Sequence, residues 1–253
     1  MPIRYARRLA GRKRTPQANR HLGLMLAFVA GAINAGGFLA VQQYTSHMTG
    51  IVSSMADNLV LGAYDLVLGG AGGLLCFVLG SMCCAVMVNY SRRRRRQAEY
   101  AMPLLLEALL LLGFGLLGSR LASIQGLFVP LTVMLLCFIM GLQNAVITKL
   151  SQAEIRTTNI TGIVTDIGIE LGKLVYWNRS PLPEARSVRV NRPRLVLLSL
   201  LALSFFLGGL GGAYGFKQFG YLATLPLAAL LVLLASGPAL DDLILSWRRL
   251  RRH

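Results

Sequence analysis

Long apolar runs separated by short polar stretches dominate the hydrophobic pattern of this chain. Six runs approach or reach the ~20 residues that an α-helix needs to cross the hydrocarbon core of a bilayer. They lie at about residues 21–41, 67–90, 101–117, 128–148, 195–216 and 219–235, the last with Pro226 inside it. The pattern therefore predicts an all-α integral membrane protein.

Two polar, glycine-containing breaks interrupt this pattern, one in each half of the chain. The first is Thr45-Ser46-His47-Met48-Thr49-Gly50-Ile51-Val52, and the second is Thr157-Thr158-Asn159-Ile160-Thr161-Gly162-Ile163-Val164. They are identical at five of eight positions, and upstream of them Gly31–Ala35 and Gly141–Ala145 form a second matched pair. We interpret the two matches as an internal repeat.

Threonine and glycine at these breaks predict that a helix begins at each of them. Threonine suits the N-cap side of a helix, and glycine allows a close approach of the backbone to a neighbour. A helix start presents unpaired N–H groups and a partial positive charge, which attract polar or anionic groups. The alternative is a paired turn that only lets helices pack, and the sequence leaves it open.

The basic residues indicate how many segments cross the membrane. If the segments that follow the two breaks do not cross, 24 of the 26 Lys and Arg residues lie on the cytoplasmic side, with Arg120 and Lys217 outside. If both segments crossed, the division would be 18 against 8. Because positive residues concentrate in cytoplasmic loops, the charge pattern favours six spans with both termini in the cytoplasm.

Six spans give each half three crossings, so the second half is expected to be inverted relative to the first. Inverted repeats with broken helices are a recurring plan of secondary transporters, in which the breaks commonly meet near the middle of the membrane. We therefore expect a basic tail at residues 1–21, membrane repeats at 22–119 and 120–238, and a basic tail at 239–253. Each break either re-enters the membrane or lies at its surface.

The composition agrees with a membrane protein and excludes other classes. Hydrophobic residues make up 55% of the chain and charged residues 14%. The four cysteines lie inside apolar runs without a CxxC pair or clustered histidines, so we expect neither a disulfide nor a metal centre. The net charge of +16 comes from basic blocks beside apolar runs, without interleaved aromatic residues. It indicates membrane orientation and contact with anionic lipid rather than nucleic acid.

No pattern typical of an enzyme is present. The chain has no nucleophile elbow, phosphate-binding loop, metal-spaced histidine pair or haem motif. Its three histidines are scattered, at positions 21, 47 and 253. We therefore predict that the protein is not an enzyme and carries no cofactor.

Polar side chains at the breaks and inside the apolar runs are the candidates for function, because such groups are costly in a membrane. Asn34 and Asn144 correspond across the repeat, and they either line a shared central site or join helices by hydrogen bonds. The candidate solute-binding residues are Asn34, Thr45, His47, Thr49, Gly50, Gln143, Asn144, Thr157, Thr158, Asn159, Thr161 and Gly162. The candidate ion-coupling residues are Asp57, Glu107, Asp166 and Glu170. For these acids the alternatives are contact with a helix dipole, an ion pair or exposure to water.

These features resemble the YoaK-like family of bacterial inner-membrane proteins, which is a domain of unknown function. The matching features are Gly-x-x-Asn-Ala from Gly31, the Thr-x-x-x-Thr-Gly break from Thr45, and the pair Gly141–Ala145 and Arg156–Gly162. The resemblance covers about residues 22–236 and implies a multi-span bacterial membrane protein. It supplies no substrate.

The chain departs from the family's pattern at two places. Asn34 stands where the family often has an acidic residue, and Ile51 stands where it often has an asparagine. These departures weaken the case for ion coupling at the first break.

The function that we expect is an inner-membrane secondary transporter or channel for a small polar or anionic solute, bound where the two breaks meet. The helix starts would donate hydrogen bonds to the solute, and the acids would tune the charge or carry a coupling proton. The alternative is a non-transporting membrane scaffold or assembly protein whose basic tails dock on lipid or a partner. Association with a second copy of the chain is left open.

Overall fold

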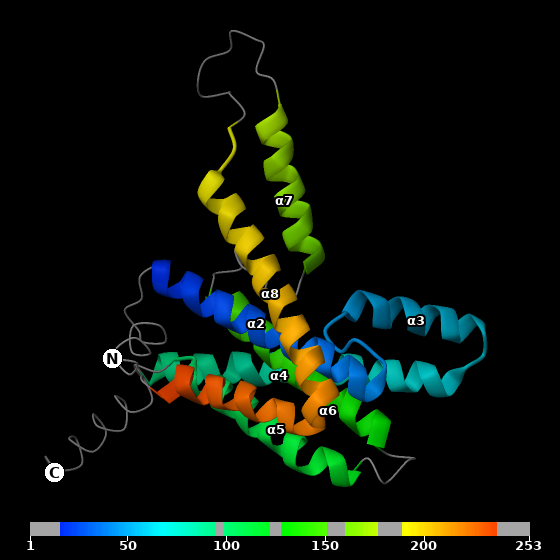
Figure 1. Cartoon of the computed structure of the whole chain (residues 1–253). Helices are drawn as coiled ribbons and strands as arrows, with labels where there is room; N and C mark the ends of the chain where they lie inside the picture. Colours follow the sequence, from blue (N-terminus) through cyan, green and yellow to red (C-terminus); the bar gives the residue numbers. More distant parts are fainter. Residues whose placement is uncertain (1–15, 95–98, 122–127, 151–159, 177–188, 237–253) are drawn as a thin grey trace, which may run out of the picture.

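The structure, a computed structural model, describes residues 16–94, 99–121, 128–150, 160–176 and 189–236, and all the regular structure in these ranges is helical. The helices are α2 (Pro16–Val41), α3 (Met48–Val60), α4 (Tyr64–Arg93), α5 (Ala101–Leu121), α6 (Phe128–Leu150), α7 (Ile160–Val175) and α8 (Arg192–Phe219). A 3-10 helix, η2 (Gly220–Ala223), follows α8 and leads into helical residues 224–236. Figure 1 shows their arrangement.

Four helical stretches are long and apolar enough to cross a membrane, which makes the chain a multi-pass membrane protein. They are Asn19–Val41, Tyr64–Arg93, Pro130–Lys149 and Arg192–Ser236. A shorter apolar helix covers Ala101–Leu116. The last of the four stretches has 45 residues. It changes direction at Gly220, whose φ of +58° is one that glycine adopts without strain.

The helices agree with the apolar runs of the sequence to within a few residues, and both segments after the breaks form separate helices, α3 and α7. The expected cap is wrong at the first break. The N-cap of α3 is His47, whose side chain makes no capping hydrogen bond, and Thr49 and Gly50 lie within the first turn. The helix therefore begins at Met48, one residue before Thr49, and no threonine of the break occupies the N-cap position.

Helices α2 and α8 pack closely along each other, because glycines remove the side chains between them. A Cβ atom at Gly31 would collide with the backbone carbonyl of Phe205, and one at Gly208 with the carbonyl of Phe28. Farther along both helices, Gly36 faces the ring of Phe216. The residue numbers of the contacting positions therefore rise together along the two helices, which means that α2 and α8 run parallel.

Helices α4 and α6 pack in the same way. A Cβ atom at Gly80 would collide with the backbone carbonyl of Phe138, and one at Gly141 with the carbonyl of Phe77. Gly72, earlier on α4, faces Met134, earlier on α6, so this pair is also parallel. The glycines and phenylalanines of the two pairs correspond, with offsets of 110 residues from α2 to α6 and 128 from α4 to α8. Small residues at such contacts allow the two backbones to approach closely. Membrane helices associate through this close packing, because the hydrophobic effect does not drive their association within a bilayer.

The first helices of the two halves, α2 and α6, run in opposite directions. The Nε2 atom of Gln143 donates to the carbonyl of Leu26 at 3.5 Å, whereas Leu136, earlier on α6, contacts Gly37, later on α2. Because α8 is parallel to α2 and α4 is parallel to α6, the two packed pairs point in opposite senses. Figure 1 shows these helices crossing at the centre of the molecule.

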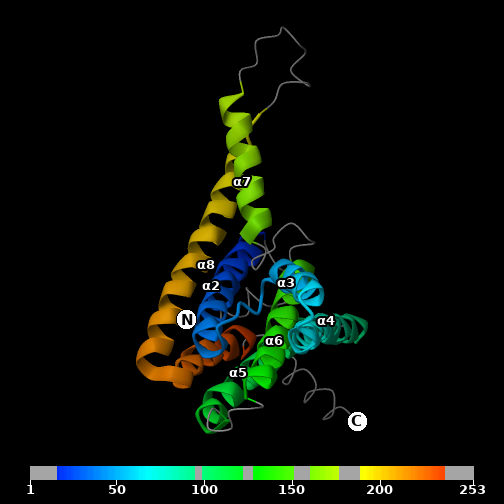
Figure 2. The same ribbon diagram turned by 90° about the vertical axis from the view of Figure 1, so that its right-hand side faces the viewer.

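Each short helix packs on the N-terminal half of the long helix that follows it, α3 on α4 and α7 on α8. Two helical hairpins result, and they extend from the central helices in different directions (Figures 1 and 2). Met55 of α3 fills the space beside Gly70 of α4, which shows how closely the first hairpin is packed. The hairpins carry the two breaks at their bases.

Candidate functional site

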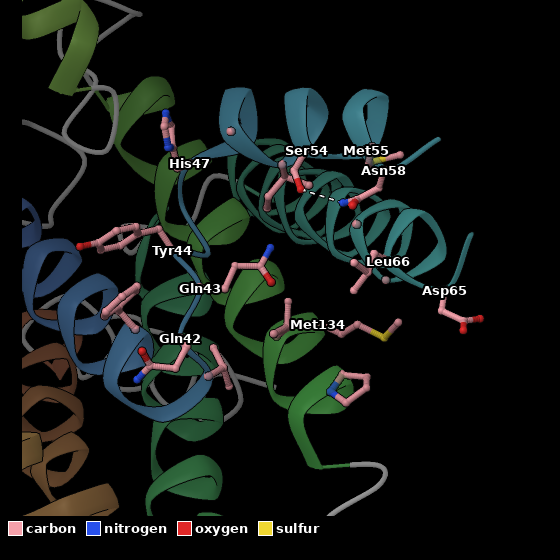
Figure 3. Close-up of a pocket in the computed structure, with 18 residues that line it drawn as sticks. Gln42, Gln43, Tyr44, His47, Ser54, Met55, Asn58, Asp65, Leu66 and Met134 are labelled. Atoms are coloured by element: carbon pink, nitrogen blue, oxygen red, sulfur yellow. Dashed lines mark hydrogen bonds between the residues drawn. The ribbon is translucent and has the colours of Figure 1, made fainter. Parts of the chain in front are cut away.

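A cavity of about 560 Å³ lies beside the first break. Its walls come from the end of α2, the connection to α3, α3 itself, the first turns of α4 and the start of α6 (Figure 3). Polar side chains line one part of it, namely Gln42, Gln43, His47, Ser54, Asn58 and Asp65. Apolar side chains line the rest, among them Ile51, Met55, Leu66, Val133 and Met134. A cavity of this size and mixed lining is typical of small-molecule sites.

The charge of this cavity is low and slightly acidic. Asp65 is the one acidic side chain among the lining residues of the described structure, and these residues include no Lys or Arg. Figure 3 shows Asp65 at the edge, pointing away from the other labelled side chains. The hydrogen-bonding groups that remain are amides, a hydroxyl and an imidazole, with Asn58 Nδ2 donating to Ser54 Oγ at 3.1 Å.

Gly50 lines this cavity, and its lack of a side chain makes room for a neighbour. A Cβ atom there would lie 2.9 Å from Nδ1 of His47, so the imidazole lies directly over the first turn of α3. The expected close approach at this glycine is therefore to an imidazole rather than to another backbone. Thr49 is exposed to one side and does not line the cavity.

Gln42 gives the cavity wall an unusual backbone conformation. Its φ is +54°, and it is the one non-glycine residue with positive φ among the described residues. Its N–H donates to the carbonyl of Phe38 at 2.7 Å, which closes the end of α2 as a left-handed residue after a helix commonly does. Glycine is the usual residue there, because other residues adopt a left-handed backbone only with strain. Glutamine at this position is therefore strained, and it places a polar side chain at the cavity.

A group of buried polar side chains lies deeper, where α2 meets α6. Ser46 Oγ donates to Asn34 Oδ1 at 2.7 Å and ties the first break to α2. Thr45 is fully buried, and its hydroxyl oxygen has no hydrogen-bond partner in the described structure. The amide oxygens of Gln143 and Asn144 are likewise buried without a partner. These are unused acceptors in the protein interior, where an unpaired polar group is costly.

The second break differs in what the structure describes. Thr157, Thr158 and Asn159 lie outside the described residues. Thr161 is exposed, and its carbonyl accepts a hydrogen bond from Thr165 Oγ1 at 2.8 Å. Gly162 is partly buried. Neither Thr161 nor Gly162 lines the cavity.

The acids that follow the second break are paired. Asp166 Oδ2 lies 3.1 Å from Arg194 Nη2 of α8. Glu170 is buried, and its two carboxylate oxygens accept from Lys173 Nζ and from the backbone N–H of Asn191, each at 2.8 Å. These hydrogen bonds, first the one from Lys173, hold the pKa of Glu170 below its ordinary value. The pairs join α7 to the start of α8.

The first turns of α3 and α7 lie near each other in two perpendicular views (Figures 1 and 2). From there, α3 and α7 extend in different directions. The cavity lies on the α3 side of this point, since the described residues of α7 contribute nothing to its lining.

The other two candidate ion-coupling residues lie in opposite surroundings. Asp57 is exposed on α3 and does not line the cavity. Glu107 is fully buried on α5, and neither of its oxygens has a hydrogen-bond partner among the residues that the structure describes. The four acids therefore do not form one site.

Sequence reasoning missed the glutamines of the cavity. Gln42, Gln43 and Tyr44 end the first apolar run, and we assigned them no role. A signal was present, because two adjacent amides directly before a break are unusual at the edge of an apolar run. Phe38 and Tyr44 stack with their ring centroids 4.5 Å apart, which fixes this connection against the end of α2.

Comparison with protein-family models gives a match over residues 22–237, which is most of the chain. The chain belongs to the DUF1275 family. That family is described as a protein of unknown function, and it is the YoaK-like family that the motifs around the two breaks resemble. No curated protein and no solved structure matches the chain.

Proposed function

We propose that this member of the DUF1275 family is a secondary transporter or channel of the bacterial inner membrane for a small, polar, uncharged solute. The observation that carries the proposal is the cavity beside the first break, with amides and a hydroxyl on one part and apolar side chains on another. An anionic solute is less well supported, because the lining has one acid and no basic residue. A solute in this cavity would meet hydrogen-bonding groups without having to displace a salt bridge.

The architecture that we propose for this function is six spans in two inverted halves, with α3 and α7 not crossing. Three features support it: the parallel pairing of α2 with α8, the parallel pairing of α4 with α6, and the opposite directions of α2 and α6. The charge asymmetry of the sequence supports it independently and would put both termini in the cytoplasm. In this arrangement the first hairpin faces outward and the second faces the cytoplasm.

The path from the cavity would continue along the buried amides. Asn34 lies four residues before Phe38 of the cavity wall, or ~6 Å along α2. Beyond it, Gln143 and Asn144 hold acceptors with no partner in the described structure. Irregular backbone and unused polar groups at membrane depth are tolerated when they line a route for water or solute.

Filling the cavity tests this function. A Cβ atom at Gly69, which lines the cavity, meets no atom within 4 Å, so Gly69→Phe introduces a ring at the cavity from a backbone position that accepts a side chain. Gly113 of α5 has equally open space and does not line the cavity, so Gly113→Phe is the matched control. We expect parent vesicles to swell in urea or glycerol, Gly69→Phe to slow the swelling at least about tenfold, and Gly113→Phe to leave it unchanged, as measured by light scattering.

Two results would contradict the proposal. One is a parent protein that makes vesicles no more permeable to these uncharged probes than protein-free vesicles are. The other is an equal swelling rate for Gly69→Phe and the parent. That result would mean that solute does not pass through the cavity, and it would favour the alternative of a non-transporting scaffold protein.

A further inference from the structure

Glu107 is a buried acid that the proposed solute path does not use. Its side chain is 0% exposed, and both carboxylate oxygens lack a hydrogen-bond partner. A carboxylate in such surroundings is strongly unfavourable unless it is paired, so a partner or a neutral form is required. The described structure supplies no partner.

The second half of the chain shows that packing alone does not require an acid here. The segment Met-Pro-Leu at residues 102–104 of α5 matches Leu-Pro-Leu at residues 225–227 of the last helix, an offset of 123. Buried positions agree at this offset, since Leu104, Ala108 and Leu111 correspond to the buried Leu227, Leu231 and Leu234. Glu107 then corresponds to Leu230, which packs against the core. An apolar side chain thus fills the equivalent place.

Helix α5 packs against α4, α6 and η2. The thiol of Cys84 on α4 lies within electrostatic range of Glu107, and Lys149 at the end of α6 lies within electrostatic range of the same thiol. Tyr221 of η2 contacts α5 elsewhere, at Phe114 and Gly118, about two turns or more away. Helical residues 224–236 carry no ionisable side chain.

A polar network lies seven residues before Glu107, or ~10 Å along the chain. Arg92 donates to Glu99 Oε2 at 3.2 Å and to the hydroxyl of Tyr100 at 2.8 Å. That hydroxyl in turn donates to the carbonyl of Lys149 at 3.0 Å. The network joins the end of α4, the start of α5 and the end of α6, at the N-terminal end of the helix that carries Glu107.

The chemistry of the site selects a proton over a metal ion. A sodium, calcium or magnesium ion needs several oxygen ligands. The described residues contain no group of three His, Cys, Asp or Glu side chains that could hold a metal, and Glu107 has no polar partner. A proton needs one carboxylate oxygen only. We propose that Glu107 is a proton-binding site, occupied in the closed packing of α4, α5 and α6 and emptied when the Arg92–Glu99–Tyr100 end of this packing opens.

One proton is exchanged between Glu107 and water in each cycle of opening and closing. The neutral acid releases one proton from a carboxyl oxygen to water that enters from that end, leaving a carboxylate that the water solvates. Closure returns one proton to the carboxyl group. Proton binding at Glu107 stands without the proposed transport function, and only its use for coupling solute movement rests on that function.

Infrared spectroscopy of the protein in lipid tests the assignment without any solute. The carbonyl band of a neutral carboxylic acid is separate from those of amides and carboxylates. We expect this band at pH 7 in the parent, its loss in Glu107→Gln and Glu107→Leu, and its retention in Asp57→Asn, which removes an exposed acid. A parent without the band, or a band that persists in Glu107→Gln, overturns the proposal.

Two measurements guard against loss of folding. We expect the melting temperature of Glu107→Leu to equal or exceed that of the parent, because leucine occupies the corresponding place in the second half. If neither variant folds, a hydrophobic carbodiimide on the unmodified protein gives the same answer, since it reacts with neutral carboxyl groups in apolar surroundings. Mass spectrometry should then find the adduct at Glu107 and not at Asp57, and the absence of an adduct at Glu107 overturns the proposal.

Discussion

The two helical hairpins occupy corresponding places in the two halves and differ in their chemistry. In the first, α3 with the start of α4, Asp57 and Asp65 form no ion pair among the described residues, and a cavity opens beside the break. In the second, α7 with the start of α8, Asp166 and Glu170 are held by basic partners, and the described residues line no part of the cavity. The two hairpins thus share their helix packing and differ in their side chains, the first opening on a cavity and the second held by ion pairs.

The largest effect should come from the part that the halves share. Gly80→Ala and Gly208→Ala would each place a Cβ atom against a backbone carbonyl of the partner helix. We expect each to lower the free energy of unfolding by about 1–3 kcal/mol, the usual cost of overpacking a core. Gly113→Ala, in open space, should be neutral or stabilising by up to about 1 kcal/mol. Thermal unfolding in detergent measures all three.

If only one of the two glycine variants were destabilised, the equivalence of the two packed pairs would fail. If both resembled Gly113→Ala, the close helix contacts themselves would be wrong.

A smaller effect should separate the second hairpin from the first by pH. Because hydrogen bonds from Lys173 and Asn191 lower the pKa of Glu170, its carboxylate stabilises the fold above the ordinary value of 4.5. That stabilisation is lost as the pH falls through the lowered pKa. Glu170→Gln should therefore unfold more easily than the parent at pH 7, and this difference should shrink as the pH falls below 4.5 and through the lowered pKa.

Limited proteolysis of the hairpin at several pH values measures this difference. Asp57→Asn of the first hairpin should show no such pH dependence, because Asp57 is exposed and has no ion pair in the described structure. A difference between Glu170→Gln and the parent that does not shrink even at the lowest pH at which the parent stays folded would contradict the pairing.

The smallest effect should appear at the matched asparagines. Asn34 Oδ1 accepts a hydrogen bond from Ser46, whereas Asn144 Oδ1 has no partner in the described part of the chain. We expect Asn34→Leu to cost about 1 kcal/mol, the net value of one such bond in a membrane protein. Asn144→Leu should cost nothing or stabilise, as measured by the same thermal unfolding. Equal costs would mean that the two halves use their asparagines alike.

The sequence was sufficient to predict the helices of this fold, because each membrane span depends on the apolar residues of its own segment and not on contacts with distant segments. It also located both breaks to within a few residues, since Thr49-Gly50 and Thr161-Gly162 lie in the first turns of α3 and α7. The repeated glycines indicated close packing, but their partners, such as Phe205 and Phe138, could not be read from the chain.

The candidate site was predicted less well, because it depends on contacts between distant segments. Arg194 meets Asp166 across 28 residues, and Asn191 meets Glu170 across 21, so the pairing of these acids leaves no local pattern. The cavity depends on the left-handed residue Gln42, which turns the chain after α2. No periodicity signals such a turn when the residue is not glycine.

The most direct test of the account labels three single cysteines in a background free of Cys76, Cys83, Cys84 and Cys137. Gly69→Cys lies at the cavity, Gly168→Cys on α7 and Gly113→Cys on α5, and at each place a Cβ atom meets nothing within 4 Å. A membrane-impermeant maleimide is added to intact spheroplasts and, separately, to inside-out vesicles. The account predicts labelling of Gly69→Cys from outside only, of Gly168→Cys from the cytoplasmic side only, and of Gly113→Cys from neither. Labelling of Gly69→Cys and Gly168→Cys from the same side would contradict the inverted arrangement and the outward cavity together.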